Sequence, residues 1–439
     1  MIKQHPLTLI TPVKKGRLED LNLLLEKIRK EIHACTEKEF SKITTVHYAR
    51  WFILNRDSFR DEPAIPVEDR LIFSSNYDGD KDEHLTELST VLATYLDQLY
   101  DCCEGYPEPG NRTPETRKKY LEQWQQKTSA FFNGAQGRSL NQIRQEKKLR
   151  DHIWNFVSKN NSNGKSAVQL HHEIQKEIDS IPEFEWSKRK AKEPSINWSI
   201  FLPYGLLLVV ALPLVIIGLI YHYLFFELRD KFKPTKLSEI PDKLVNRLVE
   251  DEDLFPQNQF TQVVVMKPGF IKKLNFKIWM LRTRVLAGSV FVKGKLLNIP
   301  TIHFARWVMF DKNKHVLFFS NFDGNWQQYL GDFIDQSGWG LSGIFSNTVN
   351  FPKTYLMGLP GIIPGMPYRI PGTKLVIAGG AYDEAHFLAW SRSTQVPTQV
   401  WYCPYPDLSI KNINNNTKIR NELRKNLNEK KAQLFLKRL

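Results

Sequence analysis

The chain has 439 residues, more than a single hydrophobic core usually organises, so at least two domains are expected. Apolar residues make up 42% and charged residues 25%, which is typical of a folded globular protein and argues against disorder. The net charge of +14 favours an anionic partner, either nucleic acid or anionic lipid. Basic residues gather beside an apolar segment and in the C-terminal tail, and no nucleic-acid-binding motif occurs. Membrane lipid is therefore expected as a partner, and nucleic acid is not.

The cysteines favour a reducing compartment. The four are Cys35, Cys102, Cys103 and Cys403, which include no CxxC spacing for zinc or redox chemistry. Adjacent cysteines rarely bridge each other. The N-terminal stretch lacks the long apolar core of a secretory signal, so the chain is expected to start in the cytoplasm.

Residues 1–100 are predicted to form a first α+β module. The expected elements are strand 7–11, helix 17–34, strand 45–51 (TVHYARW), strand 73–79 (FSSNYDG) and helix 84–100. The order β-α-β-β-α is that of a ferredoxin-like module. Residues 101–196 then read as a polar helical insertion, with a helix starting near Pro114 and a loop at 159–166.

Residues 197–228 are predicted to be a membrane segment. The run from Trp198 to Phe226 carries no charge and exceeds the roughly 20 residues that a spanning helix needs. Aromatic residues at both of its ends match the interfacial belt of membrane proteins. A buried core helix is the alternative, but few core helices lack charge over such a length.

Residues 229–410 repeat the first module. Residues 301–307 read TIHFARW and residues 318–324 read FFSNFDG, in the same order as the two motifs of the first copy, which indicates an internal duplication. The other expected elements are strand 261–266, helix 275–292 and helix 325–334, with residues 375–379 or 399–404 as the fourth strand. Paired modules usually bury the apolar faces of their sheets against each other, so we expect a pseudo-symmetric α+β barrel.

This pairing bears on the membrane topology. Basic residues flank the apolar segment on both sides, which suggests that both flanks are cytoplasmic. Pro213 lies near the middle of the segment and removes a helical hydrogen bond. A single kinked span and a re-entrant hairpin bent near Pro213 are the two alternatives. Because a barrel needs both modules on one side, the hairpin is favoured, with both modules on the cytoplasmic side.

Residues 411–439 are predicted to form a basic C-terminal helix. It has two interpretations, a helix on the membrane surface beside the inserted segment or a solvated terminal helix.

The repeated motifs supply the first candidate site residues. On a regular strand, His47, Ala49 and Trp51 point to one face while Tyr48 and Arg50 point to the other. The same alternation is expected for His303 and Arg306 in the second copy. A buried histidine is costly unless it is hydrogen-bonded, so each His and Arg either completes the interface between the sheets or performs chemistry.

Each repeated Asp-Gly pair also has two interpretations. Asp78 and Asp323 could close a tight turn in which Asp caps its own backbone and Gly supplies a positive φ. Alternatively, each Asp lies at the barrel mouth and exchanges protons with a bound oxidant or substrate.

The second copy is richer in potential site residues and is the favoured location of any activity. These residues are Trp326, Tyr329, Asp332, Trp339, His386 and Tyr402. Residues 338–343 (GWGLSG) lack the GKS/T of a phosphate loop, so nucleotide binding is unsupported. Residues 358–372 are expected to form a flexible lid or a membrane-facing loop with Ile362, Ile363 and Met366 exposed.

The tandem modules and their strand-end Asp-Gly pairs resemble the dimeric α+β barrel superfamily, which includes the dye-decolorizing (DyP-type) haem peroxidases. Residues 75–79 and 320–324 are similar to the GxxDG motif of those enzymes, with Ser in place of the first Gly. The resemblance implies Asp78 or Asp323 as a distal acid and Arg50 or Arg306 as a distal arginine. It also implies haem as a cofactor, with His303 and His386 as candidate ligands.

Two functions from different classes follow. One is a membrane-associated oxidoreductase, haem-peroxidase-like, that acts on an apolar or lipid-soluble small molecule with the Asp, Arg and His residues of both copies, including His47. The other is a non-catalytic lipid-binding or membrane-scaffolding protein that recruits a partner enzyme. Whether the chain is an enzyme is left open by the sequence.

Overall fold

A computed structural model describes the chain except residues 1, 35–38, 60–66, 160–163, 223–224, 226–228, 233, 235, 293, 297–298 and 359–375. The first half contains β1 (Gln4–Pro12), α1 (Leu18–His33), β2 (Val46–Leu54), β3 (Arg70–Asp78), α2 (Lys81–Val91), α3 (Ala93–Tyr100), α4 (Pro114–Gln123), β4 (Thr128–Asn133), α5 (Leu140–Lys159), α6 (Ala167–Asp179) and α7 (Trp198–His222). The second half contains α8 (Asp242–Val249), β5 (Gln257–Val265), α9 (Phe270–Ser289), β6 (Ile302–Phe310), β7 (His315–Asp323), α10 (Trp326–Phe345), β8 (Thr354–Gly358), β9 (Val376–Gly379), α11 (Glu384–Ser393), β10 (Val400–Tyr402), α12 (Ile410–Leu423) and α13 (Glu429–Leu436).

The expected α+β class is confirmed. Two antiparallel sheets of four strands have the orders β1-β3-β2-β10 and β4-β6-β7-β5. Each sheet takes three strands from one half of the chain and its fourth strand from the other half, since β10 pairs with β2 and β4 pairs with β6. Strand β4 was not predicted, because residues 101–196 read as helical throughout. Both candidates for the fourth strand of the second copy form strands, but neither joins the sheet of that copy. Residues 400–402 pair with β2 in the first sheet, and β9 pairs with β8 outside both sheets.

The fourth strands also join the two sheets at their other edges. Just before β4, the amide of Gln126 donates to the carbonyl of Thr8 in β1 at 2.8 Å. Just before β10, the amide of Val396 donates to the carbonyl of Thr261 in β5 at 2.9 Å. Each of these segments therefore bonds first to the sheet of its own half and then to the sheet of the other half.

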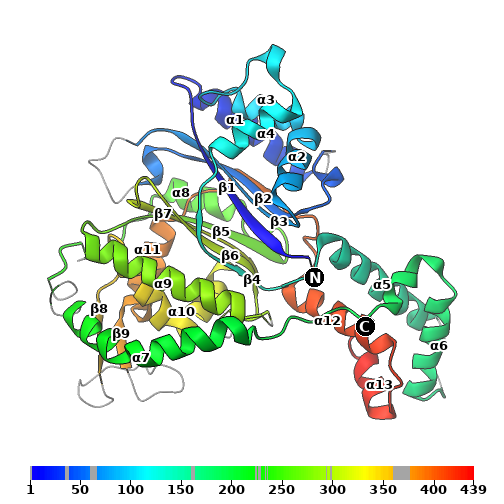
Figure 1. Cartoon of the computed structure of the whole chain (residues 1–439). Helices are drawn as coiled ribbons and strands as arrows, with labels where there is room; N and C mark the ends of the chain where they lie inside the picture. Colours follow the sequence, from blue (N-terminus) through cyan, green and yellow to red (C-terminus); the bar gives the residue numbers. More distant parts are fainter. Residues whose placement is uncertain are drawn as a thin grey trace.

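The sheets lie between two layers of helices (Figure 1). Helices α1 to α4 cover the first sheet, where Leu21, Leu25, Leu88 and Leu99 pack against the strands. Helices α9 to α11 cover the second sheet. A third apolar cluster fills the space between the sheets at one end, with Phe52, Ile72, Val308, Leu317 and Phe319 among its members. Helices α5, α6, α12 and α13 form a separate lobe around a fourth cluster.

The predicted membrane segment differs from the expected hairpin. Residues Trp198–His222 form one helix, α7, that continues through both Pro203 and Pro213. An internal proline removes one hydrogen bond, and here the helix does not divide into two arms. Among the described residues, no helix combines the length and hydropathy needed to span a bilayer. Helix α7 instead lies beside α9, and the amide of Asn197 donates to the carbonyl of Ser289 at 2.9 Å.

Candidate functional site

A β-bulge corrects the predicted orientation of the histidines. The pairing of β2 with β3 shifts register between Val46 and Tyr48, so two residues lie between Val46 and Ala49 where regular alternation has one. Val46, Ala49 and Trp51 all pack in the apolar cluster between the first sheet and its helices. The prediction that His47 lies on the same face as Trp51 is therefore wrong. The pairing of β6 with β7 has the same shift between Ile302 and Phe304.

Arg50 crosses from the first sheet to the second. Its guanidinium donates to the Thr261 hydroxyl at 2.8 Å, the Phe260 carbonyl at 3.1 Å and the Asn321 side-chain oxygen at 2.5 Å. All of these acceptors are neutral, and no carboxylate among the described residues pairs with Arg50. Burial lowers the pKa of Arg50 to about 9.

Arg306 makes the reciprocal crossing. Its guanidinium donates to the Leu7 carbonyl at 2.6 Å, the Thr8 hydroxyl at 3.2 Å and the Asn76 side-chain oxygen at 2.7 Å. Burial, followed by repulsion from Arg50, lowers the pKa of Arg306 well below its usual value. Each arginine thus binds two strands of the opposite sheet, in matching positions of the two halves.

The two predicted Asp residues each connect a histidine to the start of a helix. The Asp78 carboxylate accepts from the amide of Leu140 at 2.6 Å and lies 3.0 Å from Nε2 of His47. The Asp323 carboxylate accepts from the amide of Ile410 at 2.8 Å and lies 2.7 Å from Nε2 of His303.

Leu140 and Ile410 are the first residues of α5 and α12, so each carboxylate meets the positive end of a helix dipole.

This arrangement corrects the turn interpretation in one respect. Gly79 and Gly324 adopt positive φ values of 82° and 84°, as a tight turn requires. The side chains of Asp78 and Asp323, however, bind a histidine and a later helix rather than their own backbone. The role of each Asp depends on contacts more than 60 residues away, which local turn chemistry cannot reveal.

A polar cluster beside His47 was not predicted. The Tyr405 hydroxyl lies 2.9 Å from Nδ1 of His47, and the Tyr48 hydroxyl donates to Gln257 at 2.6 Å. Burial raises the pKa of both tyrosines well above the usual value. Burial also raises the pKa of the Cys403 thiol to about 12, so none of these groups is an activated nucleophile. Cys102, Cys103 and Cys403 are free thiols, and Cys35 lies outside the described residues.

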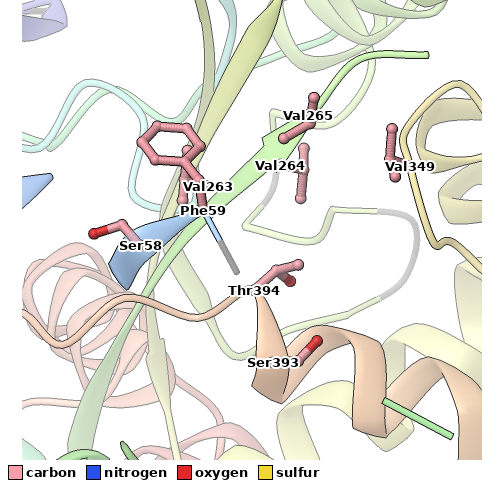
Figure 2. Close-up of a pocket in the computed structure, with 8 residues that line it drawn as sticks. All are labelled: Ser58, Phe59, Val263, Val264, Val265, Val349, Ser393 and Thr394. Atoms are coloured by element: carbon pink, nitrogen blue, oxygen red, sulfur yellow. The ribbon is translucent and has the colours of Figure 1, made fainter. Parts of the chain in front are cut away.

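The cavities lie away from these residues. One cavity has a volume of about 10 Å³. Its lining includes Ser58, Phe59, three valines of β5 and the end of α11 (Figure 2). That volume is about enough for one water molecule. A second cavity, of about 40 Å³, lies between α9 and α10. Neither is lined by any of the six residues predicted to be catalytic, which are His47, Arg50, Asp78, His303, Arg306 and Asp323.

The remaining residues singled out in the second half do not converge. The Tyr402 hydroxyl donates to the carbonyl of Phe40 in the first half, and Tyr329 stacks on Phe322 with ring centroids 3.8 Å apart. Of these predicted residues, Trp339 lines the cavity between α9 and α10, whereas Trp326 and Asp332 do not.

Residues 338–343 lie inside α10, where glycine permits close packing. A Cβ on Gly338 would come within 2.6 Å of the Tyr382 ring, and one on Gly343 within 2.0 Å of the Trp279 ring. These glycines therefore make room for aromatic side chains. Residues 359–372, most of the expected lid, lie outside the described residues, as do Ile362, Ile363 and Met366.

The two candidate haem ligands each have a ring nitrogen beside a carboxylate. His303 is 1% exposed and its Nε2 faces Asp323. Nδ1 of His386 lies 2.9 Å from Asp383, the residue at the start of α11. Over the described part of the chain, no group of three or more His, Cys, Asp or Glu side chains is placed to hold a metal ion.

No protein-family model, curated protein or solved structure matches the chain.

Proposed function

We propose that this protein is a non-catalytic membrane-surface platform, a rigid barrel attached to lipid through the outward side of α7 and α9. The observation that carries the proposal is the exposure of many apolar side chains on two helices, α7 and α9. The two helices lie side by side (Figure 1). The exposed members are Leu202, Leu206, Leu207, Val210, Leu214 and Ile217 on α7, and Phe270, Leu274, Ile278 and Leu281 on α9. We call this set the apolar surface.

The exposure of these side chains supports a lipid partner. They are between 40% and 75% exposed, and contiguous apolar surface of this kind marks a membrane or protein contact. On α9 the spacing 270, 274, 278, 281 places them on one face of the helix. A helix with one face in the interfacial region lies in the membrane plane and does not cross it.

The flanking charge supports an anionic membrane. Lys188, Arg189, Lys190 and Lys192 precede α7, and Arg229, Lys231 and Lys236 follow it, all exposed. Each basic residue near an anionic bilayer contributes about 1 kcal/mol of attraction. Both flanks can therefore contact the same leaflet while the barrel stays on one side.

The way in which the two sheets are joined favours a scaffolding function over an oxidoreductase function. We propose that it arose by duplication of a ferredoxin-like module, because Arg50 and Arg306 bind matching residues of opposite sheets. The predicted catalytic side chains are engaged by these contacts rather than directed into a cavity. Groups arranged in this way stabilise the joining of two sheets and leave no proton donor or acceptor free for an oxidant.

Co-sedimentation with lipid vesicles tests the proposal. The wild-type protein is expected to pellet with vesicles containing phosphatidylserine, more weakly in high salt, because screening weakens the charge attraction. The double variant L206E/I278E places two carboxylates in the apolar surface and should lower the partition coefficient by about tenfold or more. The matched control is L23E, which changes a 65% exposed leucine of α1 on the opposite helix layer.

Equal pelleting of wild type and L206E/I278E would refute membrane attachment through this surface. Equal loss in L23E and the double variant would also refute it, because the effect would then be one of charge alone. Circular dichroism establishes that each variant is folded before the comparison.

A further inference from the structure

The cavity between α9 and α10 is lined by an arginine, Arg282, for which the described part of the chain provides no counter-ion. The cavity has a volume of about 40 Å³, and the surface inside it is almost wholly apolar. Leu286, Trp307, Phe333 and Leu341 form part of its wall, and Arg282 of α9 is the only charged residue that lines it.

Aromatic rings hold the Arg282 guanidinium in place. Its central carbon lies 4.9 Å from the ring centroid of Trp279 and 4.7 Å from that of Trp339. Both distances are within the range of cation–π attraction. Burial lowers the pKa of Arg282, which indicates that the charged form is poorly solvated. Among the described residues, no hydrogen bond or ion pair engages this guanidinium.

Two other arginines that lie over tryptophan rings, both more deeply buried than Arg282, show what is missing. Arg392 also lies over a tryptophan ring, at 3.9 Å, but it is paired with Glu252 at 3.0 Å. Arg420 lies over Trp186 and is paired with Glu146 at 3.1 Å. A charge removed from water is costly unless it is paired. Arg282 is partly buried and unpaired among the described residues, so it is a cation that can receive an anion from outside the chain.

We propose that this cavity binds a fatty acid, with its carboxylate paired to Arg282 beside the two indole rings. Carboxylates match the fork of donors on a guanidinium, which favours a two-point ion pair. The apolar wall then receives the first methylene groups. Because the cavity is too small for a long chain, the rest of the chain lies on the apolar surface. Tyr204 of α7 lies near Arg282, which brings the cavity close to the apolar surface.

Tryptophan quenching by 2-bromopalmitate, whose bromine lies on the carbon next to the carboxylate, tests the site in solution without vesicles. Bromine quenches tryptophan fluorescence only at short range, and Trp279 and Trp339 flank the proposed carboxylate. The wild-type protein is expected to show saturable quenching. R282Q should bind at least about tenfold more weakly, because the anion loses its partner, and R282K should bind with intermediate affinity. The matched control K277Q removes an exposed charge from the same helix and should bind as the wild type does.

The methyl ester of the same acid gives a test that needs no variant. On wild-type protein the neutral ester should bind about tenfold or more weakly than the acid, because it cannot form the ion pair. Equal binding of acid and ester, or equal binding of the acid to wild type and R282Q, would overturn the proposal. Loss of binding in K277Q as large as in R282Q would overturn it too.

A brominated anionic phospholipid in vesicles distinguishes the source of the ligand. If the quenching that depends on Arg282 is stronger with the free acid than with the vesicles, the ligand is a fatty acid. If only the vesicles quench, the fatty-acid proposal is overturned in favour of a membrane headgroup. The site extends the proposed attachment to lipid, but the two fail separately. Vesicle pelleting without R282-dependent quenching overturns only the fatty-acid site, and quenching without pelleting overturns only the membrane attachment.

Discussion

Arg50 and Arg306 make the contacts expected under one of the two interpretations that the sequence left open, in which each arginine completes the interface between the sheets. The repeated sequence HYARW and HFARW marks both arginines as positions where the two copies agree. The sequence could not show that each guanidinium reaches the opposite sheet, because those contacts join residues more than 200 positions apart. The two arginines, each bound to neutral oxygen atoms, therefore stabilise the contact between the sheets.

Replacing Arg50 by glutamine is expected to lower the free energy of unfolding by about 2–4 kcal/mol, because several buried acceptors of the second sheet lose their donor. Urea denaturation measures the difference. The control is R144Q, an exposed arginine of α5, which should stay within about 0.5 kcal/mol of the wild type. A similar small change for both variants would contradict the proposed role of Arg50.

His84 gives a prediction about pH. Its ring nitrogens lie 3.1 Å from the Thr45 hydroxyl and 2.9 Å from the Ser75 hydroxyl, and burial lowers its pKa to about 3. The histidine stays neutral in the folded protein but binds a proton in the unfolded chain below about pH 6.5. Its contribution to stability is therefore present above that pH and declines as the pH falls toward 3.

Chemical denaturation at pH 7 and pH 4.5 tests this in wild type and H84Y. Tyrosine is the matched replacement because Tyr329 is the equivalent residue of the second half. Tyr329 lies seven residues after Phe322 and stacks on its ring, as His84 lies seven residues after Tyr77 and stacks on that ring. The wild type should lose up to about 1.4 kcal/mol more per pH unit than the variant over this range. An identical acid-induced loss in both proteins would show that His84 does not titrate as described.

At the scale of elements, strands with repeated motifs were predictable and the exchanged strands were not. Strands β2, β3, β6 and β7 carry long apolar runs, so composition alone marks them as strands. Strand β4 has only six residues and lies within a polar region, so its pairing with β6 depends on the whole topology. The bulges in β2 and β6 were missed because a strict alternation of two was assumed.

The contact between Asp323 and α12 is an element-scale feature that can be tested. Replacing Asp323 by alanine leaves the His303 ring and the Ile410 amide without their acceptor, so a loss of about 1–3 kcal/mol is expected. Hydrogen exchange should accelerate in the first turn of α12. The control D332A removes an Asp of α10 that binds no helix start and should leave α12 unchanged. Unchanged exchange at Ile410 in D323A would refute the link.

At the scale of the whole molecule, the two halves are interdependent. Each four-stranded sheet is incomplete without a strand from the other half, and residues 124–126 and 394–396 join the sheets at their remaining edges. The sequence predicted two paired modules, because each half carries its own motifs. It could not predict the exchange, since the choice of partner edge depends on contacts made only when both sheets are present.

Fragments test this interdependence. Residues 1–196 and 229–439 expressed separately are expected to lack a cooperative unfolding transition, because each exposes an unpaired sheet edge. Mixing them should restore near-UV circular dichroism and yield one complex in size-exclusion chromatography. A cooperative transition in either fragment by itself would show that the exchanged strand is dispensable.

The pairing of β10 with β2 also determines when the first sheet can be completed during synthesis. The outer edge of β2 is complete only after residues 400–402 have left the ribosome, almost 350 residues after β2 itself. At 5–20 residues per second, that interval is roughly 20–70 s. During it the nascent first sheet has an open edge, and α7 emerges with its apolar side chains exposed. The chain therefore completes its fold late, and both features are open to aggregation until the C-terminus is released.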